Sequence, residues 1–312
     1  MRISTSWAQQ TSVNSILDQQ SRLNQTQLQL STGKKILTPS DDPAAATRII
    51  DLNQGIKQTE QYQSNINAAR QRLTLEDGVL QNATDVLQRV NELGLQGLNA
   101  TNSPSDRIAI AVEIEELNQQ LLGLANTKNA NGEYLFSGFK SATQPFSKDP
   151  TVPNTGAYIY AGDAKQRRIQ IDSDRQIADG DYGSNVFGTP TPATIPATVL
   201  VPGSIANVFE ALDKFATDLR ANTPNSASLD DISKSFDKIL TVQSSVGTRL
   251  NALDNQEGHN TDFVLNLKTV LSETEDLDYA EAISRFNQQT LSLQAAQQAF
   301  AQVKKLSLFN YL

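Results

Sequence analysis

The sequence predicts a mainly α-helical protein: a long antiparallel, coiled-coil-like helical rod formed by both chain ends, with a small central β insertion domain. Three observations lead to this fold class. Apolar residues recur at alternating spacings of three and four along most of the chain, which is typical of helices that pack through a narrow seam. The first and last stretches share this spacing and a glutamine-rich composition. Seven of the eleven prolines fall within residues 144–203, which excludes long helices there.

The first helix is expected to end before the turn-forming segment Ser31–Lys35. Its seam positions 13, 16, 20, 23, 27 and 30 read Val, Ile, Gln, Leu, Gln, Leu, with further glutamines on the other faces. Ile16, Leu23 and Leu30 are the apolar residues that we expect to contact a partner helix. Glutamine-rich helices of this kind are marginal alone, because most of a helix's stability comes from packing an apolar face.

Asp42 before Pro43 predicts the start of the second helix, because Asp caps free N–H groups and Pro has no N–H to leave unpaired. A heptad pattern over residues 44–100 predicts one long helix. Ser103, with Asp106 three residues on, predicts the cap of another helix, whose apolar seam covers residues 110–124.

The helical period stops at Asn126. Glu133–Phe139 is short, aromatic and bounded by glycine, which predicts a strand of a short β-hairpin. The proline-rich stretch that follows contains two further predicted strands, Ala157–Tyr160 and Arg168–Ile171. Helix is expected to resume near Ile205, to break at residues 221–224, and to continue as a third long helix, in which nine of twelve seam positions between 232 and 271 are apolar.

The last helix is expected from Ala282 to the C-terminus, with seam positions 282, 286, 289, 293, 296, 300 and 303. Its candidate assembly residues are Phe286, Leu293, Phe300, Val303, Leu306 and Leu308. Almost no charges cover its other faces, so we expect protein around it. Two interpretations stay open: an ordinary two-helix hairpin of a globular core, or adhesive ends that become ordered only on assembly. An exposed seam of this kind also predicts a chaperone that captures the C-terminal segment before assembly.

Composition excludes several classes of function. A net charge of −8 and a pI near 4.8 argue against a nucleic-acid partner or an anionic membrane surface. No run of residues is long and apolar enough for membrane insertion, and the first residues lack the apolar core of a cleaved secretory signal. We therefore expect either a cytoplasmic protein or export without a cleaved signal.

No constellation of residues predicts an enzyme, a cofactor or a metal site. The chain has no cysteine, and its single histidine, His259, is expected on a helix surface. The acidic pairs at positions 172 and 174 and at 179 and 181 lack the spacing of a calcium loop, so we expect solvated turn acids.

Six segments at both ends and in the middle carry a resemblance to a known family: Met1–Thr5, Leu30–Lys34, Pro39–Ala44, Ala125–Thr127, Gly132–Gly138 and Leu306–Leu312. On these motifs the chain resembles the flagellin superfamily of bacterial flagellar axial proteins, and within it the proteins of the hook–filament junction. Asp41-Asp42-Pro43 and Tyr134–Gly138 favour a junction protein over a filament-forming flagellin. An intracellular coiled-coil scaffold is a further alternative. Such a protein would tolerate charged, self-sufficient ends, which this chain lacks.

The resemblance implies a non-enzymatic adaptor between the hook and the flagellin filament. Its implied partners are identical subunits in a ring, the adjacent hook-associated junction protein, flagellin and a flagellar export chaperone. It implies an extracellular location in the flagellum after export by the flagellar type III apparatus. The expected domains are a terminal assembly domain (residues 1–43 and 276–312), a helical rod domain (44–144 and 204–275) and an outer β domain (145–203).

Overall fold

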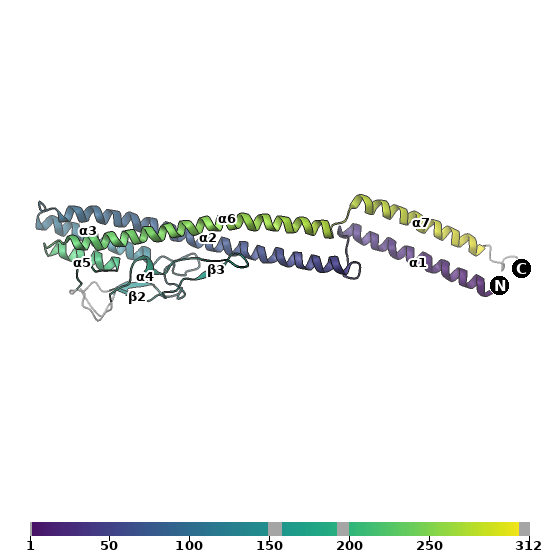
Figure 1. Cartoon of the computed structure of the whole chain (residues 1–312), viewed down its shortest axis with the longest axis horizontal. Helices are drawn as coiled ribbons and strands as arrows, with labels where there is room; N and C mark the ends of the chain where they lie inside the picture. The colour runs from purple at the N-terminus through teal and green to yellow at the C-terminus, as the bar shows by residue number, and fades with distance from the viewer. Residues whose placement is uncertain (1, 149–157, 192–199, 306–312) are drawn as a thin grey trace. The chain divides into compact units, whose positions relative to one another are not determined.

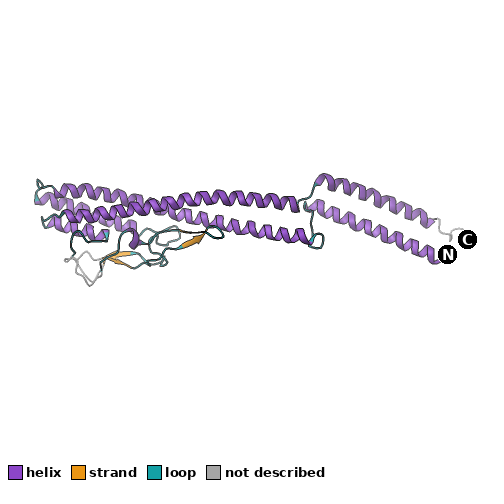
Figure 2. Ribbon diagram, viewed as in Figure 1, coloured by secondary structure: helices purple, strands orange, loops and turns teal. Residues whose placement is uncertain are grey.

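The computed structural model describes residues 2–148, 158–191 and 200–305 of the chain (Figure 1). It is mainly helical, with long helices from both ends and a small central β region, which confirms the predicted fold class (Figure 2). The chain divides into two compact units, residues 1–60 with 261–312 and residues 61–260. The helices α2 (Pro43–Leu98) and α6 (Ser226–Glu275) have residues in both units.

The first unit contains α1 (Arg2–Thr32) and α7 (Tyr279–Lys305), which lie side by side in opposite directions (Figure 1). The two chain ends therefore pair with each other, as the shared seam pattern predicts. Residues 306–312 lie outside the described residues.

The second unit has its core on the predicted seam of α2. Ile66, Leu73, Leu80 and Leu87 are fully buried and recur every seven residues. They belong to one apolar cluster with buried residues of α3 (Pro104–Ala125), α5 (Val208–Arg220) and α6. α3 and α5 make the most extensive helix contact inside this unit.

Both predicted helix caps are present. The Asp42 carboxylate accepts hydrogen bonds from the backbone N–H groups of Ala44 (3.1 Å) and Ala45 (3.0 Å) at the start of α2. Ser103 and Asp106 form a reciprocal capping box at the start of α3. These caps confirm that local chemistry, read from the sequence, places the beginnings of the long helices.

The described part of the central region contains two small antiparallel sheets and a short helix. β1 (Phe146–Lys148) pairs with β2 (Tyr158–Tyr160), and β3 (Arg168–Gln170) pairs with β4 (Gln176–Ala178). The helix α4 (Gly183–Val186) follows. The strands predicted at 157–160 and 168–171 are confirmed over residues 158–160 and 168–170, and Ala157 lies outside the described residues. An aromatic cluster packs this region onto α5, with Phe146 and Phe209 at its centre.

The prediction of a strand at Glu133–Phe139 is wrong. This segment is a series of turns with one isolated bridge, between Lys128 and Tyr134. Its aromatic character reflects burial instead, because the side chain of Phe136 is fully buried. Gly138 has a φ of +64°, a left-handed conformation that does not continue a strand.

The expectation of solvated turn acids fails for Asp179 and Asp181. Both side chains are buried. Asp179 pairs with Arg167, and Asp181 pairs with Arg249 of α6. Charges of opposite sign and hydrogen bonds compensate the loss of water around them, which is the condition under which carboxylates are buried.

Candidate functional site

The α1–α7 pair carries the candidate assembly residues. Along α7, side chains at alternating spacings of three and four are buried or partly buried, whereas most of the residues between them are exposed. They occupy the seam positions predicted from the sequence: Ala282, Phe286, Gln289, Leu293, Ala296 and Phe300. The seam of α7 is therefore confirmed over the residues whose side chains are described, and it faces α1.

On α1 the predicted seam is correct only in part. Ile16, Leu23 and Leu30 are partly buried, but Val13, Gln20 and Gln27 are exposed. The covered positions between the apolar residues are polar instead: Ser12, Gln19 and Thr26. The three correct positions belong to both possible heptad frames, and the large apolar side chain at position 13 favoured the wrong one.

The candidate assembly residues therefore fall into three groups, which differ in how much of each residue the structure describes. Ile16, Leu23, Leu30, Phe286, Leu293 and Phe300 are partly buried along the inner face of the α1–α7 pair. Val303 is in α7, but its side chain is outside the described part of the chain. Leu306 and Leu308 lie outside the described residues.

Large apolar side chains on the outer faces of the same pair were missed by the seam template. On α1, Leu17 is 58% exposed and Leu28 is 56% exposed. On α7, Ile283 is 51% exposed and Leu291 is 68% exposed. Trp7, the only tryptophan, is also largely exposed. Each of these residues lies outside the predicted seam positions. The presence of large apolar residues outside the seam is therefore the sequence signal that identifies them.

Among the described residues, the inner face of the α1–α7 pair contains buried hydrogen-bond acceptors that have no donor. The side-chain amide oxygens of Gln19 on α1 and Gln289 on α7 are buried without a hydrogen-bond partner in the described structure. A buried acceptor left without a donor costs about 1–3 kcal/mol. The terminal pair is therefore less stable than an all-apolar seam of the same length would be.

The base of the pair is held by backbone hydrogen bonds across the start of α7. The Lys35 N–H donates to the Glu275 carbonyl (2.7 Å), and the Leu277 N–H donates to the Gly33 carbonyl (3.0 Å). The Lys34 ammonium forms an ion pair with the Glu275 carboxylate. These contacts fix the point at which α1 and α7 meet.

The turn between α1 and α2 is organised by Asp41. Its carboxylate accepts hydrogen bonds from the backbone N–H groups of Thr38 (2.9 Å) and Leu37 (3.1 Å), and from the Gln25 side chain (3.3 Å). The Thr38 N–H, and then the Leu37 N–H, hold the pKa of Asp41 below its usual value. The turn is therefore tied to α1 by an ionised carboxylate at neutral pH.

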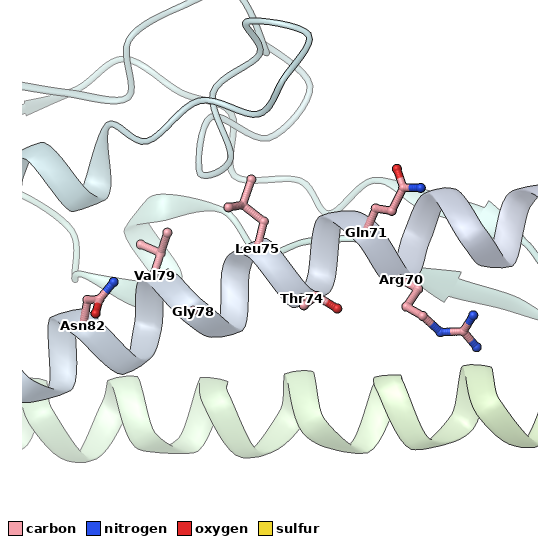
Figure 3. A pocket seen from close by; sticks show the side chains of 7 residues that line it. All are labelled: Arg70, Gln71, Thr74, Leu75, Gly78, Val79 and Asn82. Atoms are coloured by element: carbon pink, nitrogen blue, oxygen red, sulfur yellow. The ribbon is translucent and has the colours of Figure 1, made fainter.

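A shallow groove of about 630 Å³ lies along one side of α2 in the second unit (Figure 3). It is lined by Arg70, Gln71, Thr74, Leu75, Gly78, Val79 and Asn82. Ligand pockets usually gather polar groups from several elements around an enclosed space. A groove lined by one helix suits contact with a protein surface better than capture of a small molecule.

No group of three or more His, Cys, Asp or Glu side chains placed to hold a metal ion occurs in residues 2–148, 158–191 and 200–305. None of the helices in that part of the chain combines the length and the hydropathy that a membrane span requires.

Comparison with protein families matches both ends of the chain. Residues 3–141 match the bacterial flagellin N-terminal helical region, and residues 229–312 match the bacterial flagellin C-terminal helical region. The unmatched stretch between them includes β1, β2, β3 and β4.

Among known proteins, the chain is 33% identical to flagellar hook-associated protein 3 of Escherichia coli (strain K12), over 99% of each chain. It is 31% identical to flagellar hook-associated protein 3 of Salmonella typhimurium, again over 99% of each. It is 24% identical to a flagellin of Bacillus subtilis, over 98% of this chain and 97% of the flagellin.

Solved structures agree with these similarities. The crystal structure of flagellar hook-associated protein 3 from Legionella pneumophila superposes with a TM-score of 0.63 at 26% identity, covering 72% of this chain and 98% of that one. A flagellar junction protein from the same organism gives a TM-score of 0.59 at 25% identity, covering 75% of this chain and all of that one.

Proposed function

The chain belongs to the bacterial flagellin family, and from this membership we propose that it is a structural subunit of the bacterial flagellum that joins the hook to the filament. Similarity to hook-associated protein 3 covers the whole chain, so it includes both terminal helices and the central β region. The role is that of a non-enzymatic adaptor, in agreement with the structural proteins that it resembles.

The alternative function is that of a filament-forming flagellin. Identity is higher to hook-associated protein 3 (33%) than to the flagellin of Bacillus subtilis (24%), although both comparisons cover nearly the whole chain.

The observation that carries an assembly role is the exposed apolar surface outside the α1–α7 seam. Leu17, Leu28, Ile283 and Leu291 are more than half exposed although the inner seam is already covered. Burying one leucine or isoleucine fully contributes about 1.5–3 kcal/mol. A ring in which every subunit repeats the same contact multiplies this contribution.

On this basis residues 1–43 and 276–312 form the assembly domain, residues 44–144 and 204–275 the helical domain, and residues 145–203 the outer β domain. In the assembly domain the seam residues hold α1 to α7, and the exposed apolar residues contact the neighbouring subunits. Val303, Leu306 and Leu308 extend the same apolar set toward the C-terminus.

The partners proposed for this domain are identical subunits in a ring, the adjacent hook-associated junction protein on one side and flagellin on the other. Before assembly, a flagellar export chaperone covers the C-terminal segment. Export proceeds through the flagellar type III apparatus, and the protein then resides in the extracellular flagellum.

Labelling of isolated flagella tests the proposal. An antibody against this protein, viewed by electron microscopy on hooks with attached filaments, should mark one narrow band where hook and filament meet. A label distributed along the whole filament would favour the flagellin alternative. A label absent from flagella but present inside the cell would favour an intracellular scaffold.

A further inference from the structure

The β3–β4 hairpin and the segment after it are fastened to α2 and α6 by polar groups. The Asn65 side chain of α2 donates to the Gln170 carbonyl (2.8 Å), and the Gln256 side chain of α6 donates to the Asp172 carboxylate (3.1 Å). At the other end of the hairpin, Arg249 of α6 donates to the Ala178 carbonyl (3.3 Å). Polar contacts of this kind hold firmly only while every buried member is satisfied.

Glu76 of α2 lies at the centre of this attachment. Its side chain is 1% exposed, and its carboxyl accepts a hydrogen bond from the Asp181 N–H (3.1 Å). Gly180 passes directly over it: a Cβ atom there would lie 3.4 Å from Glu76 Oε2 and 3.2 Å from Arg72 Nε. The backbone of the segment therefore covers the carboxyl closely.

The charges around Glu76 come from every element packed against it. Three arginines face three other acids, and the pairs are Arg249 with Asp181, Arg167 with Asp179, and Arg72 with Glu133. Arg72 and Glu76 are on α2, Arg249 is on α6, and the remaining groups belong to the central region. Glu76 is thus a fourth acid among three cations that each pair with another acid, although Arg72 Nε is buried without a hydrogen-bond partner among the described residues.

Burial is the largest influence on this carboxyl, followed by the negative charge of Asp181, and together they raise the pKa of Glu76 to about 8. Arg249, the Asp181 N–H and Arg72 act in the opposite direction with smaller effect. Glu76 is consequently neutral at pH 7 while the segment is docked, which leaves three positive and three negative charges in the cluster.

We propose that Glu76 is a proton-dependent clasp: the segment of residues 166–183 stays docked on α2 and α6 while the Glu76 carboxyl is protonated, and loosens when the proton is lost. Ionisation places a fourth negative charge beside Asp181 under a covering backbone that excludes water. The segment can relieve this cost by moving away and admitting water.

The direction of the pH dependence follows from proton binding. Docked Glu76 keeps its proton up to about pH 8, whereas a solvated glutamate loses it near its ordinary pKa of 4.5. Between these values the docked state binds more protons than the loosened state, so docking weakens as pH rises. The contribution is fully present below pH 4.5, and it is lost by the time the pH has passed 8.

Hydrogen exchange followed by mass spectrometry on the full chain tests the clasp. Exchange of residues 166–183 would be measured at pH 6.5 and pH 8.5 and corrected for intrinsic rates with an unfolded peptide of the same sequence. In the wild type, protection of this segment should fall about 25-fold across that interval, while protection of α3 stays constant. Glu76→Gln, which cannot ionise, should abolish the change.

Glu76→Met provides a second non-ionisable variant if Glu76→Gln does not fold. Glu113→Gln is the matched control, because Glu113 is an exposed carboxylate on α3 paired with Arg89, and this variant should keep the wild-type pH dependence. Equal pH dependence in the wild type and in either Glu76 variant would overturn the proposal, as would constant protection in the wild type.

Discussion

The Tyr279 hydroxyl stands where a side chain on Gly33 would have to be: a Cβ atom at Gly33 would lie 2.8 Å from Tyr279 Oη. Gly33 also has a φ of +71°, a left-handed conformation in which residues with a Cβ are strained. Its N–H donates to the Gln29 carbonyl (2.8 Å) and completes the C-terminus of α1. Two independent requirements therefore place a glycine at the base of the α1–α7 pair.

Gly33→Ala should loosen this pair without affecting the core. The strained backbone costs about 1–3 kcal/mol, and the approach to Tyr279 adds to it until the tyrosine side chain moves. Hydrogen exchange of the α1 and α7 amides should accelerate, whereas exchange of α3 amides should remain unchanged.

Gly258→Ala is the matched control. Gly258 lies inside α6 with no atom within 4 Å of an added Cβ. Alanine is the better helix former by about 0.8–1 kcal/mol, so this variant should stabilise its helix and leave α1 and α7 as they are. Similar losses of α1 protection in both variants would contradict the geometric account of Gly33.

Limited proteolysis of the purified monomer should remove the ends first. The α1–α7 seam is narrow, polar in part and incompletely hydrogen-bonded, so it offsets little of the ordering entropy of about 1–2 kcal/mol per residue. Roughly the first 40 and last 30 residues should be trimmed, leaving a resistant core. Ends that resist protease as well as the core does would count against this prediction.

Phe300→Ala should weaken assembly rather than folding of the core. Loss of this side chain costs about 3–5 kcal/mol in each subunit where it is fully buried in the polymer. Cells with this variant should make hooks and secrete the protein but shed filaments into the medium, and the melting temperature of the core should hardly change.

Leu87→Ala serves as the contrasting variant, because Leu87 is fully buried in the α2 core. It should lower the melting temperature through a loss of about 2–5 kcal/mol. A Phe300→Ala protein with a lowered core melting temperature and normal motility would mean that α7 acts in folding rather than in assembly.

The C-terminal helix should also be the chaperone's binding site. A truncation that ends at Asp278 removes all of α7 and with it Phe286, Leu293 and Phe300. Affinity for the export chaperone, measured by calorimetry, should fall below detection for the truncated chain. Equal affinity for the full and truncated chains would place the binding site elsewhere.

The long helices could be predicted because their information is local. The caps at Asp42 and Ser103 depend on residues within three positions, and the α2 seam repeats every seven residues. The seam of α7 could be predicted for the same reason, since Phe286, Leu293 and Phe300 mark one heptad position unambiguously.

The errors arose where distant residues decide the structure. On α1, polar Ser12, Gln19 and Thr26 face α7, and no local pattern distinguishes them from the exposed glutamines. At residues 133–139, the aromatic residue Phe136 is buried within turns. In the sequence it cannot be distinguished from an aromatic residue that is buried within a strand. The pairing of Asp181 with Arg249 joins residues 68 positions apart, so an acid in a glycine-containing turn gave no sign that it would be buried.

The pairing of α1 with α7 also constrains when these two helices can contact each other. The backbone contacts at its base join residues near position 34 to residues near position 276, so about three quarters of the chain separates the two partners. Contacts between such distant residues form late, because loop closure must precede them. Whichever end of the chain emerges first must therefore wait, unpaired, until the other end arrives.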